Sequence, residues 1–265
     1  MEAFGRLSDA LRGNGVQVLD LSQHVTLEEQ EVSGQLVNRL FTRDVGATLG
    51  SKVVLGSAGA QMRNPDFHFA RRALQRLLDA EQISTAANQP GCSIEFGDLI
   101  ILSPSAVLIN VGYRTNRSAV EQLVPLLMEE GFEEIGLTTL PKEMNVPHLD
   151  VACNVVGGRW LLALSFARHM PVEVITPHAP PSYQMLPSFA SRHGYQMIWV
   201  PPGHDPLGHI NFISLAEDTI LASTSGVLLP TLLRECGIDL RQIDIQALEQ
   251  GCGGIRCLTL PLVRG

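Results

Sequence analysis

The sequence predicts an α/β protein built from a repeated unit of two strands, a helix and a third strand. Apolar residues make up 45% of the 265 positions, which is enough for a large core. Two β-rich runs about a short turn recur at intervals of roughly fifty residues, and each pair is followed by a helical pattern and a further strand. A Rossmann-like sheet would alternate single strands with helices, so we expect an internally repeated domain instead.

The clearest copy of this unit begins at residue 98. Residues 98–112, DLIILSPSAVLINVG, contain two β-rich runs about a Ser-Pro-Ser turn and predict a hairpin. Residues 118–131, SAVEQLVPLLMEEG, combine a serine N-cap, apolar positions three to four apart and a glycine stop, which together predict a helix. Residues 133–140, EEIGLTTL, then predict the third strand.

Three further copies follow the same order with weaker patterns. They comprise a hairpin over 41–57, a helix over 68–82 and a strand after Ile83; a hairpin over 150–167, a helix over 181–194 and a strand over 195–202; and a hairpin over 209–224, a helix over 226–237 and a strand over 238–245. The two ends supply a helix and a strand (VQVLDL) within residues 1–21 and a lone strand at 257–262 (CLTLPL). We expect these ends to close a fifth unit that is one strand short.

Composition and charge restrict the class of protein. The formal net charge is −8, with 27 acidic and 19 basic residues and no run of Lys or Arg, so nucleic acid is not an expected partner. An acidic surface modestly favours the approach of a small cation. No apolar stretch approaches the roughly 18 residues of a membrane span, and the N-terminus lacks the apolar core of a signal peptide. Five scattered cysteines without a CxxC pair predict a reduced, cytoplasmic protein without disulfides or structural zinc.

Five short motifs resemble one family in both content and order. They are FTRD (41–44), IEFGD (94–98), GYRTN (112–116), HLDVACNVV (148–156) and GCGGIRCLTLPLVR (251–264). Over nearly the whole chain they resemble the guanidino-group-modifying enzymes, which are the arginine deiminases, dimethylarginine dimethylaminohydrolases and amidinotransferases. The resemblance implies a single domain over 1–265, with the pentein fold: a five-bladed α/β propeller of ββαβ units around a central site. This agrees with the unit count above, with the N-terminal blade one strand short.

The resemblance also implies catalytic residues. Cys257 stands where the family's GGGGxxC segment has its nucleophile, although a buried structural cysteine in a closing strand is the plain alternative. His148 matches the family's general acid and base. The other four cysteines are expected to be structural.

Carboxylates are the natural partners of a guanidinium, because they accept its planar fork of N–H donors. By resemblance Asp44, Glu95 and Asp150 hold the substrate, whose charge would favour the Cys257 thiolate. Asp98 has a plausible structural role at a strand turn.

Arginines are expected to bind the far end of an amino-acid substrate. Arg114 matches the family's carboxylate-binding arginine. Arg71 is a weaker candidate, because FARRAL lacks the acidic residue expected after RR. Arg63 competes with it, and a solvated position on a helix is an equally good interpretation of Arg71.

The expected activity is hydrolysis of a guanidino C–N bond in arginine or an N-substituted arginine, giving citrulline through a covalent cysteine thiouronium intermediate. Transfer of the amidino group to an amine uses the same intermediate and stays open. A catalytically silent binding protein also stays open, since Phe96 replaces the first glycine of the family's EGGD and one strand is missing. No cofactor and no metal are expected. A homodimer stays open as well, because an incomplete blade leaves unpaired backbone groups.

Overall fold

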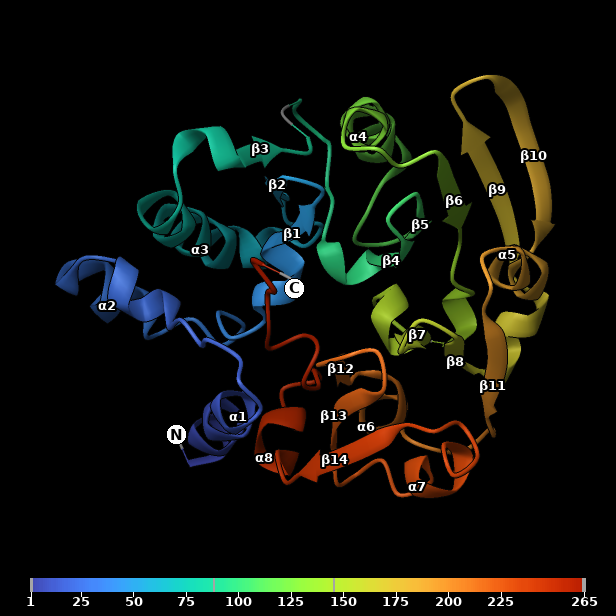
Figure 1. Cartoon of the computed structure of the whole chain (residues 1–265). Helices are drawn as coiled ribbons and strands as arrows, with labels where there is room; N and C mark the ends of the chain where they lie inside the picture. The colour runs from blue at the N-terminus through green and yellow to red at the C-terminus, as the bar shows by residue number, and fades with distance from the viewer. Residues whose placement is uncertain (1, 88, 145, 264–265) are drawn as a thin grey trace.

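The computed structural model describes residues 2–87, 89–144 and 146–263, and four copies of one supersecondary unit dominate this part of the chain (Figure 1). Each copy has an antiparallel hairpin, then a helix, then a strand that pairs in parallel with the second strand of the hairpin. A parallel partner needs a crossover connection, and the helix supplies it. The four predicted ββαβ copies are therefore confirmed.

The bounds of the elements follow the predicted order. The first unit comprises β1 (Gly46–Leu49), β2 (Lys52–Leu55), α3 (Asn64–Leu77) and β3 (Ile83–Thr85), and the second β4 (Leu99–Ser103), β5 (Ala106–Asn110), α4 (Arg117–Glu129) and β6 (Glu134–Thr138). The third comprises β7 (Cys153–Val156), β8 (Trp160–Leu164), α5 (Leu186–Arg192) and β11 (Gln196–Val200), and the fourth β12 (Ile213–Ser214), β13 (Thr219–Ser223), α7 (Leu229–Leu232) and β14 (Asp239–Ile243). Outside the units lie α1 (Glu2–Gly13), α2 (Leu27–Ser33), α6 (Pro206–Ile210) and α8 (Gln246–Glu249).

The third unit contains a hairpin that the sequence pattern did not predict. Strands β9 (Pro171–Thr176) and β10 (Ala179–Met185) form it, and β9 pairs antiparallel with β6, so the second sheet has the order β10-β9-β6-β5-β4. The helix predicted over 181–194 was therefore wrong in its first part. Pro180 and Pro181 lie in the edge strand β10, where a missing N–H donor is tolerated, beside a register shift before Ser182.

The two ends of the chain do not form the predicted fifth sheet. Helix α1 is present, but residues 16–20 have no regular structure and residues 257–262 are not a strand. The β-rich letters CLTL instead lie in a turn, in which the Leu258 N–H donates to the Gly254 carbonyl (3.3 Å) and the Thr259 N–H to the Arg256 carbonyl (3.1 Å). A mixed α/β fold is confirmed, whereas a five-bladed propeller is not.

Each completed unit buries one face of its sheet under its helix. In the second unit, the apolar stripe of α4 packs against β5 and β6 in a fully buried cluster that includes Leu123, Leu127, Val107, Ile109 and Ile135. Figure 1 shows the four sheets arranged around a common centre, with the chain end lying against the first unit. The loops that enter the hairpins meet at this centre.

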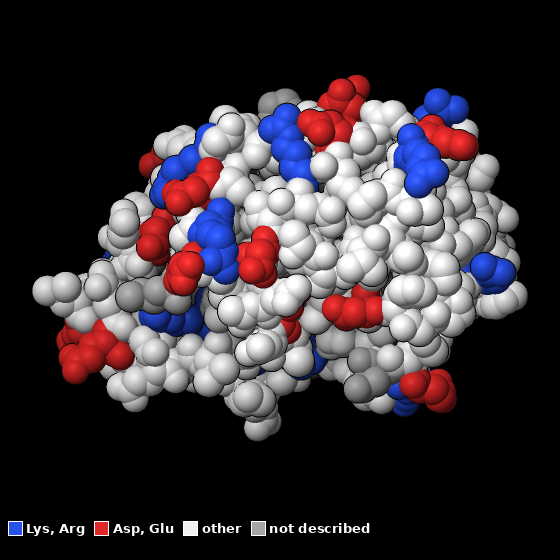
Figure 2. All heavy atoms as spheres, turned by 90° about the horizontal axis from the view of Figure 1, so that it is seen from below, with Lys and Arg blue, Asp and Glu red and all other residues white. Residues whose placement is uncertain are grey.

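The surface shows no concentration of one charge on the face seen in Figure 2. There, Lys and Arg side chains are interspersed with Asp and Glu side chains and with broad uncharged areas. Among the described residues, no helix is both long and apolar enough to cross a membrane.

Candidate active site

The repeated fold brings equivalent positions of the units together. A short 3₁₀ turn precedes the first hairpin strand in three units, and each turn contains an aspartate: Asp44 before β1, Asp98 before β4 and Asp150 before β7. In the fourth unit Asn211 lies just before β12. All four side chains are buried. The polar site is therefore a product of the repeat, because each unit contributes one acidic or amide side chain to the centre.

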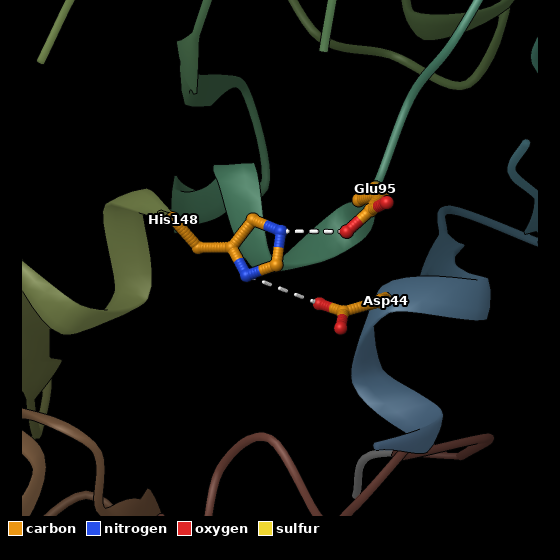
Figure 3. Close-up of side chains that lie close together, drawn as sticks. All are labelled: Asp44, Glu95 and His148. Carbon is orange, nitrogen blue, oxygen red and sulfur yellow. Dashed lines mark hydrogen bonds and ion pairs between the residues drawn. The ribbon is translucent and has the colours of Figure 1, made fainter. Parts of the chain in front are cut away.

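His148 lies between two of the predicted carboxylates (Figure 3). Its Nε2 is 2.8 Å from Oε2 of Glu95, and its Nδ1 is 3.5 Å from Oδ1 of Asp44. All three side chains are almost completely buried. Three predicted site residues from three different units thus come together, with His148 in contact with both carboxylates.

The neighbouring charges determine whether His148 and Glu95 are protonated. Burial alone would lower the pKa of His148, but the nearby Asp44 and the hydrogen bond to Glu95 raise it to about 10. Burial alone would raise the pKa of Glu95, but the hydrogen bond and charge of His148, with Arg114 and Arg63, lower it to about 2. The imidazole is therefore protonated near neutral pH and the carboxyl is ionised.

Stability should depend on pH through this pair. The folded pKa of His148 lies above its unfolded value of 6.5, so its contribution is complete below about pH 6.5 and is lost as the pH rises through about 10. The contribution of Glu95 is complete above about pH 4.5 and is lost as the pH falls towards 2. We expect the loss of unfolding free energy in His148→Asn to be largest between these limits, near pH 5.5, and to shrink at about pH 9.5, as measured by urea unfolding. His178→Asn, which changes an exposed histidine, is the control, and a loss that is the same at every pH would contradict the assignment.

Gly97 provides the space in which Asp44 and His148 approach each other. A Cβ at this position would lie 2.6 Å from Oδ1 of Asp44 and 2.8 Å from Cγ of His148. The second glycine of the EGGD motif is therefore required sterically. We expect Gly97→Ala to lower the free energy of unfolding by about 1–3 kcal/mol. Gly158→Ala, where a Cβ would contact nothing within 4 Å, is the matched control in urea unfolding, and equal effects of the two changes would refute the steric explanation.

Cys257 lies next to Asp150, the third predicted carboxylate. Its backbone N–H donates to Oδ1 of Asn211 (3.0 Å), and its Sγ is 3.7 Å from Oδ2 of Asp150. Burial, Asp150 and Asp44 raise the pKa of the thiol well above its usual value. Asp44 and Asp150 also raise the pKa of His148, so the charges of these two carboxylates act on both the thiol and the imidazole. The predicted nucleophile and acid are thus in one site, with the thiol protonated in the free chain.

Arg256 connects the segment around Cys257 to Asp150 and to Leu99. Its Nη1 donates to Oδ2 of Asp150 (2.7 Å), the oxygen nearest the thiol, and its Nη2 donates to the Leu99 carbonyl (2.8 Å). The sequence did not assign this arginine a role. Cys252, also in this segment, is exposed and has a φ of 67°, a conformation that favours glycine.

The arginines were predicted only in part. Arg114 lies at the site, with Nη1 3.3 Å from Oε1 of Glu95. The Arg71 Nη2 donates to the Gly56 carbonyl (2.8 Å). Arg63, the competing candidate, contacts both Asp44 and Glu95. The signal that favours Arg63 is Asp66 three residues later, which pairs with its Nε at 3.4 Å.

Asp98 and Phe96 have structural roles. Oδ1 of Asp98 accepts from the Asn110 side chain (2.8 Å) and from the Leu149 backbone (3.1 Å), so it holds the His148 segment against the second unit. Burial raises the pKa of Asp98 to about 7. The Phe96 ring is fully buried in the apolar cluster of the second unit, so its side chain serves packing.

Asp44, Glu95 and His148 are also a group that could ligate a metal, since one ligand atom from each lies within 4.8 Å of the others. However, the guanidinium of Arg63 contacts the same two carboxylates and would repel a cation. This donor set therefore suits the planar guanidinium that it already holds better than a metal ion.

The motifs at this site connect the chain to known proteins. The family model for arginine deiminase matches residues 13–163, more than half of the chain. The chain belongs to the arginine deiminase family. This arginine deiminase family member is 28% identical to the uncharacterized protein YkgA of Bacillus subtilis strain 168, over all of this chain and 80% of YkgA. It is 23% identical to the arginine deiminase of Listeria welshimeri, over 86% of this chain but only 62% of that enzyme.

A solved structure shares the fold of this arginine deiminase family member. Dimethylarginine dimethylaminohydrolase from Pseudomonas aeruginosa, in a mutant complexed with citrulline, superposes with a TM-score of 0.72. The match covers 98% of this chain and 86% of that enzyme, at 16% identity. The predicted membership of the guanidino-group-modifying enzymes is confirmed.

Proposed function

We propose that this chain hydrolyses a guanidino C–N bond of arginine or an N-substituted arginine, with Cys257 as nucleophile, and releases citrulline. The observation that supports this proposal is the convergence of a thiol, a protonated imidazole and three buried carboxylates at the centre of the repeats. A protein that only binds a ligand needs neither a nucleophile nor an acid beside it.

The proposed reaction begins with binding of the substrate guanidinium between Asp44 and Glu95. Bidentate carboxylate contacts fix the planar cation and polarise its central carbon. The added positive charge opposes the effect of Asp150 and Asp44 on the thiol, so the pKa of Cys257 falls and the thiol releases its proton to solvent, since His148 is already protonated. Sγ then attacks the central carbon and forms a tetrahedral adduct.

Proton transfer by His148 completes both halves of the reaction. The protonated imidazole gives its proton to the departing nitrogen, and ammonia or an alkylamine leaves with the electrons of the broken C–N bond. The neutral imidazole then removes a proton from water, which attacks the thiouronium carbon. The C–S bond breaks, the thiolate is restored and citrulline is released. A well-placed imidazole in this role contributes about 10²–10⁴ in rate.

Arg114 distinguishes an amino-acid substrate from one without a carboxylate. Its side chain is 28% exposed and lies beside Glu95, within reach of the far end of a bound ligand. We expect Arg114→Ala to lower kcat/KM for arginine by about 10²-fold or more, since truncating one partner of a charge pair costs several kcal/mol, and to change agmatine turnover little. Arg117→Ala, in the adjoining helix, is the control. Equal losses for both substrates would indicate a structural role for Arg114.

The proposal is tested by offering arginine, monomethylarginine, dimethylarginine and agmatine to the wild-type chain and measuring products by mass spectrometry. Citrulline or a carbamoyl product, with a trapped adduct on Cys257, is the expected result. Product that appears only when glycine or lysine is added as acceptor would assign amidino transfer instead. No product and no adduct under any of these conditions would overturn the catalytic proposal.

A further inference from the structure

The carboxylates proposed to bind the substrate already hold a guanidinium that belongs to the chain. Nη1 of Arg63 contacts Oδ2 of Asp44 and lies 3.4 Å from Oε2 of Glu95. Only 5% of the Arg63 side chain is exposed. The cation thus lies in the polar centre of the site rather than on the surface.

The surroundings of Arg63 match a guanidinium on several sides. Nη2 donates to the carbonyls of Asn38 and Phe41 at 3.5 Å, Nε pairs with Asp66 at 3.4 Å, and the guanidinium carbon lies 5.4 Å from the centre of the Phe67 ring. Carbonyl acceptors, carboxylates and an aromatic face are the groups that bind this cation. Burial alone would lower the pKa of Arg63, but Asp44, Glu95 and Asp66 raise it, so the group is charged.

Arg63 contacts one oxygen of each carboxylate, so a second guanidinium could not make bidentate contacts with the pair while Arg63 stays. Oδ2 of Asp44 is in contact with Arg63, and Oε2 of Glu95 is shared between Arg63 and His148. A further cation would add to the positive charge that Arg63, Arg114 and the protonated His148 already bring to this buried pair. An external guanidinium therefore needs Arg63 to leave.

We infer that Arg63 acts as an internal competitor, occupying the Asp44 and Glu95 pair in the free chain and leaving when an external guanidinium binds. This inference rests on the proposed function, which supplies the external ligand. It means that the free site is closed by a like-charged side chain, and that ligand affinity is reduced by the free energy needed to displace it.

The residues on either side of Arg63 are exposed. Arg63 ends a 3₁₀ helix at Gln61–Arg63, the neighbouring Met62 is 75% exposed, and Asn64 is exposed as well. The connection from β2 is held at Gly59, whose N–H donates to Oε1 of Glu95 (2.8 Å) and whose Cα has no room for a side chain beside the Arg114 backbone. Displacement of Arg63 would therefore be a movement of its side chain and its exposed neighbours, with Gly59 kept in place.

Free guanidinium ion is the appropriate probe, because it has the required cation and no further groups. We expect Arg63→Ala to bind guanidinium chloride at least tenfold more tightly than the wild type in calorimetric titration, with sodium chloride at equal ionic strength as reference. The same salt at ~10 mM, well below denaturing concentrations, should raise the Tm of Arg63→Ala and leave that of the wild type unchanged. Arg72→Ala, which removes an exposed arginine on the following helix α3, should behave like the wild type.

Arg63→Lys is a second variant for the same test, for use if Arg63→Ala does not fold. Lysine keeps the charge but lacks the planar fork, so guanidinium should displace it more easily than it displaces arginine. Equal affinity of guanidinium for the wild type and for the variants, or no binding to any of them, would overturn the inference. The titration requires no turnover. Tight binding to Arg63→Ala in a chain that turns over no substrate would therefore uphold Arg63 as competitor and reject the hydrolase, and turnover with equal affinities would do the reverse.

Discussion

Replacing Cys257 with serine is expected to lower turnover of the guanidino substrate by at least about 10³-fold. A hydroxyl is a far weaker acid and nucleophile than a thiol, and Asp150 and Asp44 further oppose its ionisation. Serine is close to cysteine in size, so the buried turn around residue 257 should remain intact. The measurement is kcat on the best substrate, with mass spectrometry of the quenched enzyme to confirm that the adduct on this residue is lost.

Cys252→Ser is the matched control, because Cys252 belongs to the same segment but is exposed. Its kcat should stay within about twofold of the wild type, as for a surface substitution. Activity of Cys257→Ser within tenfold of the wild type would place the nucleophile elsewhere or remove covalent catalysis altogether.

Replacing Arg256 with methionine is expected to have the largest effect on stability, a loss of about 3–5 kcal/mol in the free energy of unfolding. The change leaves the Asp150 carboxylate fully buried without its arginine partner, so that Oδ2 keeps only the Cys257 thiol and Oδ1 has no hydrogen-bond partner in the structure. It also releases the Leu99 carbonyl, so the segment around Cys257 loses this hydrogen bond to the start of β4. Urea unfolding monitored by circular dichroism measures the loss.

Two further variants test whether the buried charge is the cause. Arg256→Met combined with Asp150→Asn should recover part of the lost stability, because the remaining partner is then neutral. Arg192→Met, which breaks the exposed pair with Glu134, should cost less than about 1 kcal/mol. An Arg256→Met loss as small as the Arg192→Met loss would mean that water reaches Asp150.

The sequence predicted the parts of the fold that depend on local pattern. Alternating apolar runs about tight turns, each followed by a helical period, are set within about fifty residues, and the four units formed as expected. The β9–β10 hairpin was missed because the proline-rich letters after residue 179 suit either an edge strand or the start of a helix, and pairing with β6 decides between them. The strand expected at 257–262 was wrong because contacts with distant residues bend this segment into a turn.

In the candidate site, too, local motifs were predictable from the sequence, whereas contacts between distant residues were not. The acidic residues, His148 and Cys257 were identified from motifs, and the structure brings them together. Arg71 was a weaker candidate with Arg63 as its competitor, and the structure places Arg63 against Asp44 and Glu95, whereas the Arg71 side chain donates to the Gly56 carbonyl. The role of Arg256 could not be predicted, since its partner Asp150 is 106 residues away in the chain.

The separation of the site residues along the chain also bears on how the protein folds. The Arg43 side chain donates to the Arg256 carbonyl across 213 residues (3.3 Å), next to both Asp44 and Cys257. Closing so long a loop has a large entropic cost, and contacts of this range slow folding relative to the local pairing of each hairpin. The repeats can therefore acquire their secondary structure early, whereas the Cys257 thiol comes next to Asp150 only when the last segment docks. A partly folded chain would contain most of the sheets but not the assembled candidate site.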